Sequence, residues 1–355
     1  MNIAVLLSGG VDSSVALKLL QEQGHNLTAF YLKIWLEDEL SFLGECPWED
    51  DLSFVRQVCE QNNIKLEIVS LQQEYKDRII SYTIEEVRAG RTPNPDVLCN
   101  SRVKFGAFYD IIGEQFDYVA TGHYADLEII DDLVCLKTTP DLIKDQTYFL
   151  SHLTQKQLQK ALFPIGKLNK EQVRKLAAKY NLINQNRKDS QGLCFLGKIK
   201  YNDFIKAHLG ENKGLIIDID TNLAVGEHKG LWFHTIGQRQ GIGLSGGPWY
   251  VVAKDVTKNI LFISKKYFEN KIRNKLIAHS CNWISGNIPD LSSNIEVKLR
   301  HGAKRIPATC LNINDEIKVT LSEQDQGIAP GQFIAFYQDD YCLGSGVIKL
   351  ANYFT

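Results

Sequence analysis

The hydrophobic pattern of the first 125 residues alternates between two periods. Short apolar runs predict strands at residues 3–7, 27–35, 64–71 and 118–121. Apolar residues at helical spacing lie between these runs, after residue 14, around residues 52–59 and from residue 79 to a C-capping Gly90. Strands that alternate with helices in this way predict a parallel sheet with helices on both faces.

The pattern changes after about residue 205. Glycine-rich pieces at 230–244 and 249–256 look like strands, and from Leu276 onward short alternating strands separated by turns predict a small β-barrel. We therefore expect an α/β protein with three domains: a parallel-sheet domain (1–204), a small central domain (205–274) and a C-terminal barrel (275–355).

Composition limits the classes of function. The chain has 355 residues, of which 44% are hydrophobic and 23% charged, and its net charge is −2. With no global basic field, any nucleic acid has to be held by local patches. No run of 18 apolar residues is present to span a membrane, and the chain starts with a strand and not a leader peptide. We expect a cytoplasmic protein, or one in an equivalent organelle compartment.

Eight cysteines are scattered along the chain without any CxxC pair, at positions 46, 59, 99, 135, 194, 281, 310 and 342. This spacing argues against a zinc site and against a secreted disulfide framework. Most of these cysteines are expected to be small buried hydrophobes. The surroundings of Cys99 and Cys194 suggest chemistry.

The stretch SGGVDSS, residues 8–14, lies between the first strand and the first helix. Gly9 and Gly10 carry no side chain, so backbone N–H groups there can approach a phosphate, and the helix N-terminus adds its dipole. Serine hydroxyls line the same turn, and Asp12 is a candidate Mg²⁺ ligand. A kinase-type loop needs GxxxxGK[ST], but the first lysine is Lys18. The alternative is a plain tight turn.

Gly122 follows the strand at 118–121, in the stretch TGHYA. Ligands of parallel sheets bind at the carboxyl ends of the strands, where both this stretch and the SGGVDSS turn are expected. Gly122 would allow close approach of an adenine or ribose, or would serve a simple turn.

The stretch GRTPNPDVLCN, residues 90–100, starts a further helix. Pro93 and Pro95 stiffen it, Asp96 is expected as the N-cap, and Cys99 is expected on the same face of the first turn. The helix dipole favours a thiolate at Cys99, whereas the neighbouring carboxylate opposes it. Cys99 is therefore either a reactive thiol or a buried structural residue.

Cys194 lies between Gly192 and Gly197 in the stretch KDSQGLCFLG. A glycine-bounded segment suits a sulfur that has to move, and it equally suits an ordinary loop. If the two thiols react with each other, this segment is expected to adopt more than one conformation.

These motifs resemble those of known enzymes. SGGVDSS alone resembles the pyrophosphate loop of the ATP-pyrophosphatase superfamily, whose members cleave ATP to AMP and pyrophosphate while activating a carbonyl oxygen. The ordered set SGGVDSS, GRTPNPDVLCN, ATGHYA, KDQTYFLS, KDSQGLCFLG, HTIGQRQGIG and APGQ resembles the tRNA-specific 2-thiouridylase family along essentially the whole chain. The pair TPNPDxxCN and KDSxGxCF is its most specific part.

This resemblance implies ATP-dependent replacement of oxygen by sulfur at carbon 2 of the wobble uridine, position 34, of tRNA. Cys194 would carry a persulfide, Cys99 would be the nucleophile that completes transfer with formation of a Cys99–Cys194 disulfide, and Asp96 would be the acid or base. Asn94 and Pro95, with Asp96, would contact the target base. The implied partners are Mg²⁺, the tRNAs for Lys, Glu and Gln, and a persulfide-donating relay protein or cysteine desulfurase.

The same resemblance implies two sets of binding residues. The ATP contacts would be Leu6, Leu7, Ser8, Gly9, Gly10, Val11, Asp12, Ser13, Leu32 and Gly122. The tRNA contacts would be Lys144, Asp145, Gln146, Arg300 and His301. Two departures from the family pattern are the Leu6-Leu7 pair before SGG, where many relatives have Gly-Met, and the stretch 37–51, whose role is unassigned.

Arg300, His301, Lys304 and Arg305 cluster in a chain with almost no net charge. They are expected to hold the tRNA backbone, and the alternative is a solvated charged turn. Two other functions are compatible with the loop: ATP-driven amidation, which leaves both cysteines unexplained, and non-catalytic binding of tRNA or nucleotide, which would release no pyrophosphate.

Overall fold

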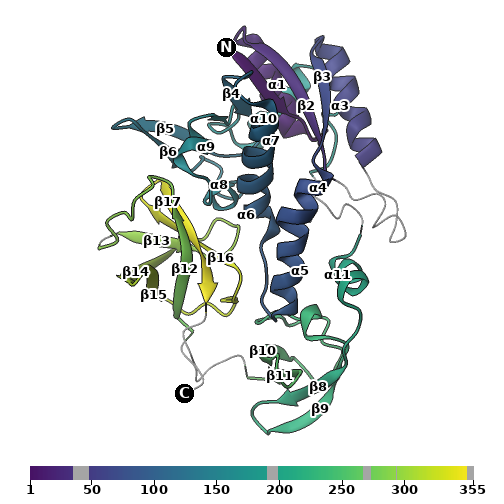
Figure 1. Cartoon of the computed structure of the whole chain (residues 1–355), viewed down its shortest axis with the longest axis vertical. Helices are drawn as coiled ribbons and strands as arrows, with labels where there is room; N and C mark the ends of the chain where they lie inside the picture. The colour runs from purple at the N-terminus through teal and green to yellow at the C-terminus, as the bar shows by residue number, and fades with distance from the viewer. Residues whose placement is uncertain (35–47, 190–198, 267–272, 293, 350–355) are drawn as a thin grey trace.

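The computed structural model describes residues 1–34, 48–189, 199–266, 273–292 and 294–349. Figure 1 shows three parts: an α/β domain that contains the N-terminus, a β-barrel beside it, and a small sheet domain at the far end of the long axis. The expected fold class is confirmed. Among the described residues, no helix is both long and apolar enough to cross a membrane.

The first domain is built on a five-stranded parallel sheet in the order β3-β2-β1-β4-β7. All four predicted strands are present, with ends shifted by one or two residues. The sheet strands are β1 (Asn2–Leu6), β2 (Asn26–Lys33), β3 (Lys65–Ser70), β4 (Tyr118–Ala120) and β7 (Ala161–Leu162). The helices of this domain are α1 (Val11–Glu22), α3 (Trp48–Asn62), α4 (Gln72–Tyr75), η2 (Lys76–Ile80), α5 (Ser81–Arg88), α6 (Pro95–Cys99), η3 (Asn100–Ala107), α7 (Phe108–Ile112), α8 (Thr147–Leu150), α9 (Gln155–Leu158) and α10 (Lys170–Lys179).

Strand β1 is apolar from Ile3 to Leu6 because helices cover both of its faces there. Ile3 and Val5 pack in a cluster with α1 and α3, whereas Ala4 and Leu6 belong to the larger cluster with α5, α6 and α7. Strand β1 lies between β2 and β4, so the chain crosses from one half of the sheet to the other between β3 and β4. The loops after β1 and β4 therefore meet at the carboxyl edge, where parallel sheets bind ligands.

The central domain carries a four-stranded sheet in the order β10-β11-β8-β9. Its elements are α11 (Tyr201–Leu209), β8 (Gly214–Asp218), β9 (Leu223–His228), η4 (Leu231–Phe233), β10 (Tyr250–Asp255) and β11 (Ile260–Ser264). The strand-like interpretation of 249–256 is confirmed as β10, but that of 230–244 is wrong. Gly237, Gly241 and Gly243 have φ values of +87°, +75° and +81°, which an extended strand does not accommodate.

The predicted C-terminal barrel is confirmed as six strands in the order β12-β15-β14-β13-β16-β17, closed by pairing of β12 with β17. They are β12 (Lys275–Trp283), β13 (Ile295–Lys298), β14 (Ile306–Ile313), β15 (Glu316–Leu321), β16 (Phe333–Gln338) and β17 (Tyr341–Lys349). A hairpin from the first domain, β5 (Asp126–Ile130) and β6 (Leu133–Lys137), extends this sheet, because Tyr341 and Cys342 of β17 pair with β6.

A buried ion pair joins the barrel to the first domain. Lys298 Nζ lies 3.2 Å from Asp145 Oδ1, and the two side chains are 2% and 0% exposed. Asp145 also accepts hydrogen bonds from the Thr139 and Thr147 backbone N–H groups and from the Thr147 hydroxyl. The pair therefore fixes how β13 sits against the segment before α8.

Removing one partner of this pair should be costly, because the other charge stays buried. We expect Lys298→Met to lower the free energy of unfolding by about 3–5 kcal/mol, and Asp145→Asn in the same chain to restore most of it. Urea unfolding measures both changes. The matched control is Lys304→Met, which should change stability by less than about 1 kcal/mol because the Lys304 side chain is 69% exposed beside Glu323. Equal losses for Lys298→Met and Lys304→Met would contradict this assignment.

The central domain docks on the end of α5. Lys254 of β10 donates a hydrogen bond to the Gly90 carbonyl oxygen at 3.1 Å, and a Cβ on Gly90 would lie 2.5 Å from Val256 Cγ2. Burial lowers the pKa of Lys254 from 10.5 to about 8.

This lowered pKa predicts a pH dependence. Below pH 8 the Lys254 amine is protonated in both states, so it contributes no slope. Between pH 8 and 10.5 the unfolded chain binds the proton and the folded chain does not, so stability should rise with pH, by up to about 1.4 kcal/mol per unit. Subtracting the urea-unfolding profile of Lys254→Met from that of the wild type isolates this contribution. A difference that stays flat across that window would refute it.

Candidate active site

The SGGVDSS turn is held by its carbonyl oxygens. Gly9 has a φ of +74°, and its carbonyl accepts hydrogen bonds from Asn184 Nδ2 at 2.8 Å and Arg187 Nη1 at 3.0 Å. The Gly10 carbonyl accepts hydrogen bonds from the Ser13 and Ser14 hydroxyls at 3.1 and 3.0 Å. Since the carbonyls are occupied in this way, the turn keeps the shape that presents the N-terminus of α1.

Gly122 lies directly against that helix N-terminus. A Cβ at this position would be 2.5 Å from the Ser13 backbone nitrogen and 2.8 Å from the Asp12 carbonyl carbon. Both interpretations of Gly122 placed it at the carboxyl edge of the sheet, and it is there. The space that it leaves is filled by the backbone of α1, which gives this glycine a packing role.

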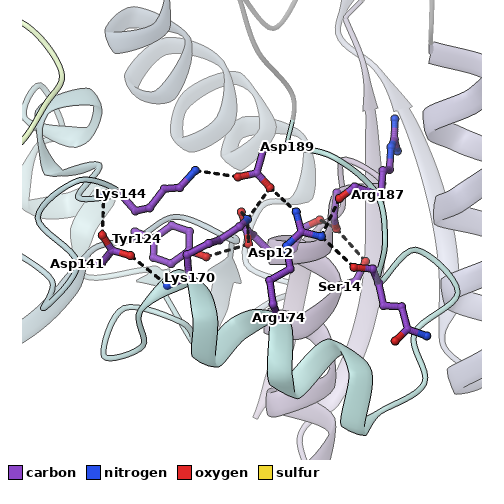
Figure 2. Close-up of polar contacts among 12 residues, drawn as sticks. Asp12, Ser14, Tyr124, Asp141, Lys144, Lys170, Arg174, Arg187 and Asp189 are labelled. Atoms are coloured by element: carbon purple, nitrogen blue, oxygen red, sulfur yellow. Dashed lines mark hydrogen bonds and ion pairs between the residues drawn. The ribbon is translucent and has the colours of Figure 1, made fainter.

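Asp12 carries the polar centre of the site. Its Oδ1 accepts hydrogen bonds from the Tyr124 hydroxyl at 2.9 Å and from Lys170 Nζ at 2.7 Å, and Lys170 also lies 2.9 Å from Oδ2 (Figure 2). Tyr124 follows β4 and Lys170 begins α10, so three distant segments meet at this carboxylate. Burial, then the charge of Asp12, raises the pKa of Tyr124, which keeps its hydroxyl a donor.

Asp189 forms a second polar centre next to the first. Its carboxylate lies 2.7 Å from each of three cations, Lys144, Lys170 and Arg174, as Figure 2 shows. Partial burial raises the pKa of Asp189, but hydrogen bonds from Lys144 and Lys170 outweigh it and bring the pKa to about 2. Asp189 is therefore ionised at any physiological pH.

The sequence did not indicate most of this cluster. Lys170 and Arg174 lie in a helix without a motif of its own, and Tyr124 lies in the TGHYA stretch, where Gly122 alone suggests a bound ligand. The available signal is the string RKDSQG, which contains Arg187 and Asp189 and directly precedes the Cys194 segment. Arg187 also pairs with Asp51 and stacks on Phe54 of α3, so the end of the unassigned stretch 37–51 supports the turn.

The Cys99 region begins with a capped helix. The N-cap is Asn94, whose side chain accepts a hydrogen bond from the Val97 N–H at 3.5 Å, and Pro95 is the first helical residue. The expectation that Asp96 is the N-cap is therefore wrong. Proline favours the first helical position, so the N-cap is the residue directly before Pro95, which is Asn94. Asp96 lies in the first turn, and Cys99 ends α6, three residues later, with 1% of its surface exposed.

The barrel supports this helix start. Asn94 Nδ2 donates to the Tyr148 hydroxyl at 3.2 Å, and Tyr148 in turn donates to the Phe333 carbonyl at 3.1 Å. Gln332 Nε2 donates to the carbonyls of Thr92 and Pro93 at 3.1 and 3.0 Å. The expected target-base segment is thus clamped between two domains.

A cleft of about 400 Å³ lies beside this clamp. All three domains line it: the first through Thr92, the central one through 235–238, and the barrel through Arg300, Ala329 and Gln332 among others. Cys194, the second expected catalytic residue, lies outside the described residues. The expectation that its segment adopts more than one conformation therefore stays a prediction.

Comparison with known proteins shows the family. Three family models match in succession: the tRNA methyl transferase HUP domain over 1–198, the tRNA methyl transferase PRC-barrel domain over 202–265 and the aminomethyltransferase beta-barrel domain over 273–348. Proteins named tRNA-specific 2-thiouridylase MnmA are 45% identical in Parabacteroides distasonis and 42% identical in Porphyromonas gingivalis, each covering 98% of this chain and 99% of the relative. The chain belongs to the tRNA-specific 2-thiouridylase family.

A third such relative, from Bacteroides fragilis, is 45% identical over 98% of this chain and all of its own length. A solved NMN synthetase from Francisella tularensis covers 59% of this chain and 77% of its own, with 16% identity and a TM-score of 0.36, which is too low to support an argument. The family models divide the chain at 198–202, whereas the boundary that we expected at 204/205 falls inside α11.

The expected tRNA contacts of this family member lie in two places. Lys144 pairs with Asp189, Gln146 accepts a hydrogen bond from the Tyr124 N–H, and Asp145 between them is fully buried. In the barrel, His301 stacks on Phe149 with ring centroids 4.9 Å apart.

The basic cluster of the barrel is largely paired. Arg300, which is 55% exposed, bonds Asp325, and Lys304 lies 2.5 Å from Glu323. Arg305 is 13% exposed and packs on the Tyr337 ring, 4.5 Å from its centroid. Of these three, Arg300 and Lys304 alone present charge to solvent.

The remaining expected ATP contacts surround the turn. Leu6, Leu7 and Val11 are buried core residues, Ser8 is exposed, and Leu32 is half-buried on β2. Within the described residues, no group of three or more His, Cys, Asp or Glu is arranged to hold a metal ion. Asp12 fits a metal only as a single carboxylate, and in this structure Lys170 occupies both of its oxygens.

The packing of Gly122 predicts the effect of a methyl group there. We expect Gly122→Ala to weaken ATP binding and also to lower the free energy of unfolding without nucleotide by about 1–3 kcal/mol, because the new Cβ meets backbone atoms of α1. Calorimetric titration and urea unfolding measure the two effects. Gly10→Ala is the matched control, since among the described residues its Cβ would meet Ser8 Oγ alone, at 3.4 Å, and it should destabilise less. Unchanged stability of Gly122→Ala would argue against the packing role.

Proposed function

We propose that this protein is an ATP-dependent tRNA 2-thiouridylase that acts on the wobble uridine. The observation that carries the proposal is that the family match spans all three domains, together with relatives of that name over 98% of the chain. The geometry supports it, because one edge of the sheet offers a phosphate turn, and Thr92, two residues before the helix start at Asn94, lines a cleft between the domains.

In the first step the C2 carbonyl oxygen of uridine 34 would attack the α-phosphorus of ATP. The bond from that phosphorus to the bridging oxygen breaks, and pyrophosphate leaves with the electron pair. The α1 N-terminus and the Gly9–Gly10 turn would hold the phosphates, with Gly122 and Leu32 near the nucleoside. Mg²⁺ would take most of its ligands from ATP itself and one from Asp12, which neutralises the charge that develops on the phosphates.

In the second step sulfur replaces the activated oxygen. The terminal sulfur of a Cys194 persulfide would attack carbon 2, and AMP leaves with the former carbonyl oxygen. The Cys99 thiolate then attacks the Cys194 sulfur, which leaves the thiocarbonyl on the base and a Cys99–Cys194 disulfide on the enzyme. A thiol reductant must reduce this disulfide before a relay protein or desulfurase reloads Cys194. The alternative order, in which Cys99 first releases hydrosulfide, gives the same products.

Asp96 and the base-binding residues would act around Cys99. Asp96 lies one turn before Cys99 on α6, at the spacing that allows a carboxylate to take or return a proton near the reacting base. Asn94 and Pro95 at the helix start would border the base. The tRNA, for which those for Lys, Glu and Gln are the candidates, would contact Lys144, Gln146, Arg300 and His301. Asp145 would act by holding the barrel in place, since its carboxylate is buried.

The function is tested with tRNA, ATP, Mg²⁺, a sulfur donor and a thiol reductant. We expect AMP and pyrophosphate as products and 2-thiouridine by nucleoside mass spectrometry, which distinguishes a sulfur-for-oxygen exchange from an added methyl group. Cys99→Ser should still accept persulfide on Cys194 but form no thiouridine, because the last exchange lacks its thiolate. Asp96→Ala should load persulfide normally and slow transfer by about 10²-fold or more.

One control variant and two contrary outcomes make this test specific. Cys310→Ser removes a buried barrel cysteine and should thiolate tRNA at the wild-type rate. ADP and phosphate as the main products would reject the adenylation step. Thiolation by Cys99→Ser at the wild-type rate would reject the two-cysteine mechanism.

A further inference from the structure

The SGGVDSS turn lacks the lysine that phosphate loops of kinases carry, and α10 brings one to the same place. Lys170 is the first residue of this ten-residue helix, after the N-cap Asn169, and its ammonium contacts both oxygens of Asp12 at 2.7 and 2.9 Å. The two residues are 158 positions apart in the sequence. Lys170 therefore places an ammonium group beside the turn, whose own sequence contains no lysine.

Arg174 stands one helical turn after Lys170 on the same face of α10 (Figure 2). Its guanidinium donates to the carbonyls of Gln185 and Arg187 at 2.9 and 2.7 Å and to Asp189 at 2.7 Å. These bonds fix the orientation of the guanidinium. Lys170 and Arg174 thus form a cationic pair that shares the Asp189 carboxylate.

The other two cations of the cluster, Arg187 and Lys144, have other roles. Arg187 braces the turn through the Gly9 carbonyl and is paired with Asp51. Lys144 belongs to the segment expected to contact tRNA. Lys170 and Arg174 lie together on α10, and among the described residues their charged partners are the two carboxylates at the mouth of the turn.

The ion pairs of Lys170 and Arg174 with the two carboxylates can be replaced by contacts to a bound phosphate. The Lys170, Arg174, Asp12 and Asp189 side chains are 17% to 32% exposed, and ion pairs that solvent reaches are weak. An incoming polyphosphate carries more charge than either carboxylate and offers oxygens to both cations at once. A phosphate next to Asp12 would be repelled unless a cation lies between them, which is where Mg²⁺ would replace the Lys170 ammonium.

We propose that Lys170 and Arg174 bind the β- and γ-phosphates of ATP and stabilise the pyrophosphate leaving group, while Asp12 and Asp189 hold both cations in place before ATP arrives. This inference rests on the proposed function. When the bond between the α-phosphorus and the bridging oxygen breaks, the electron pair passes to that oxygen, and N–H groups of the two side chains donate to the pyrophosphate that forms. Asp189 acts as a positioning residue and does not touch the substrate.

The test is calorimetric titration of the full chain with Mg²⁺ and three probes: ATP, pyrophosphate and AMP. We expect Lys170→Met to weaken the binding of ATP and pyrophosphate at least about tenfold. AMP should bind within about twofold of the wild-type affinity, because it lacks the β- and γ-phosphates. Lys175→Met is the matched control on the same helix, since Lys175 is 73% exposed and pairs with Glu171 on the helix surface. It should bind all three probes like the wild type.

Asp189→Asn separates a positioning role from a merely structural one. Without this carboxylate the two cations are no longer held at the turn, so ATP and pyrophosphate should bind about threefold or more weakly while AMP binding stays within about twofold, whereas damage to the fold would weaken every probe. If Lys170→Met does not fold, Lys170→Gln and Arg174→Gln provide the same comparison.

Equal losses for AMP and ATP, or unchanged pyrophosphate affinity in the Lys170 and Arg174 variants, would overturn the assignment. Such a result with a wild type that still thiolates tRNA leaves the proposed function intact. A wild type that binds no ATP overturns both.

Discussion

A glycine turn that offers its N–H groups to phosphate has carbonyl oxygens that need partners elsewhere, and the rest of this site depends on how they are met. The Gly10 carbonyl is satisfied locally by Ser13 and Ser14. The Gly9 carbonyl is satisfied by Asn184 and Arg187, from a segment 175 residues away. Because buried polar groups must be paired, the turn keeps its shape only while the segment after α10 is docked on it.

This dependence explains why the site is built from separated segments. The chain that supplies Asn184 and Arg187 continues directly to Asp189, and α10 before it supplies Lys170, so satisfying one carbonyl also delivers the charges around Asp12. On the other side, Gln332 and Tyr148 connect the helix that carries Cys99 to the barrel. The SGGVDSS turn is thus positioned by the segment after α10, whereas α6 with Cys99 is positioned by the barrel.

The sequence predicted whatever is encoded locally. Apolar runs located the strands of the parallel sheet and the barrel, and the glycine turn and the 94–99 helix start were recognisable as motifs. Residues that act through tertiary contact were not predictable in this way, because Lys170, Arg174 and Tyr124 look like ordinary helix or loop residues. The buried Lys298 was equally hidden, since an alternating strand pattern does not reveal that a charged residue faces a carboxylate from another domain. The glycine-rich stretch 230–244 misled because its composition does not show which glycines have positive φ.

The hairpin β5–β6 has a consequence for how this protein divides into parts. It belongs to the first domain by chain order, yet β6 pairs with Tyr341 and Cys342 of the last strand (Figure 1). A fragment that ends before the barrel would carry this hairpin with a bare strand edge, and an isolated barrel would lose its two outermost strands. Unpaired edges promote association between chains. Truncation at the family-model boundaries should therefore yield pieces that self-associate, and recombining domains between relatives requires the hairpin and the barrel to be exchanged together.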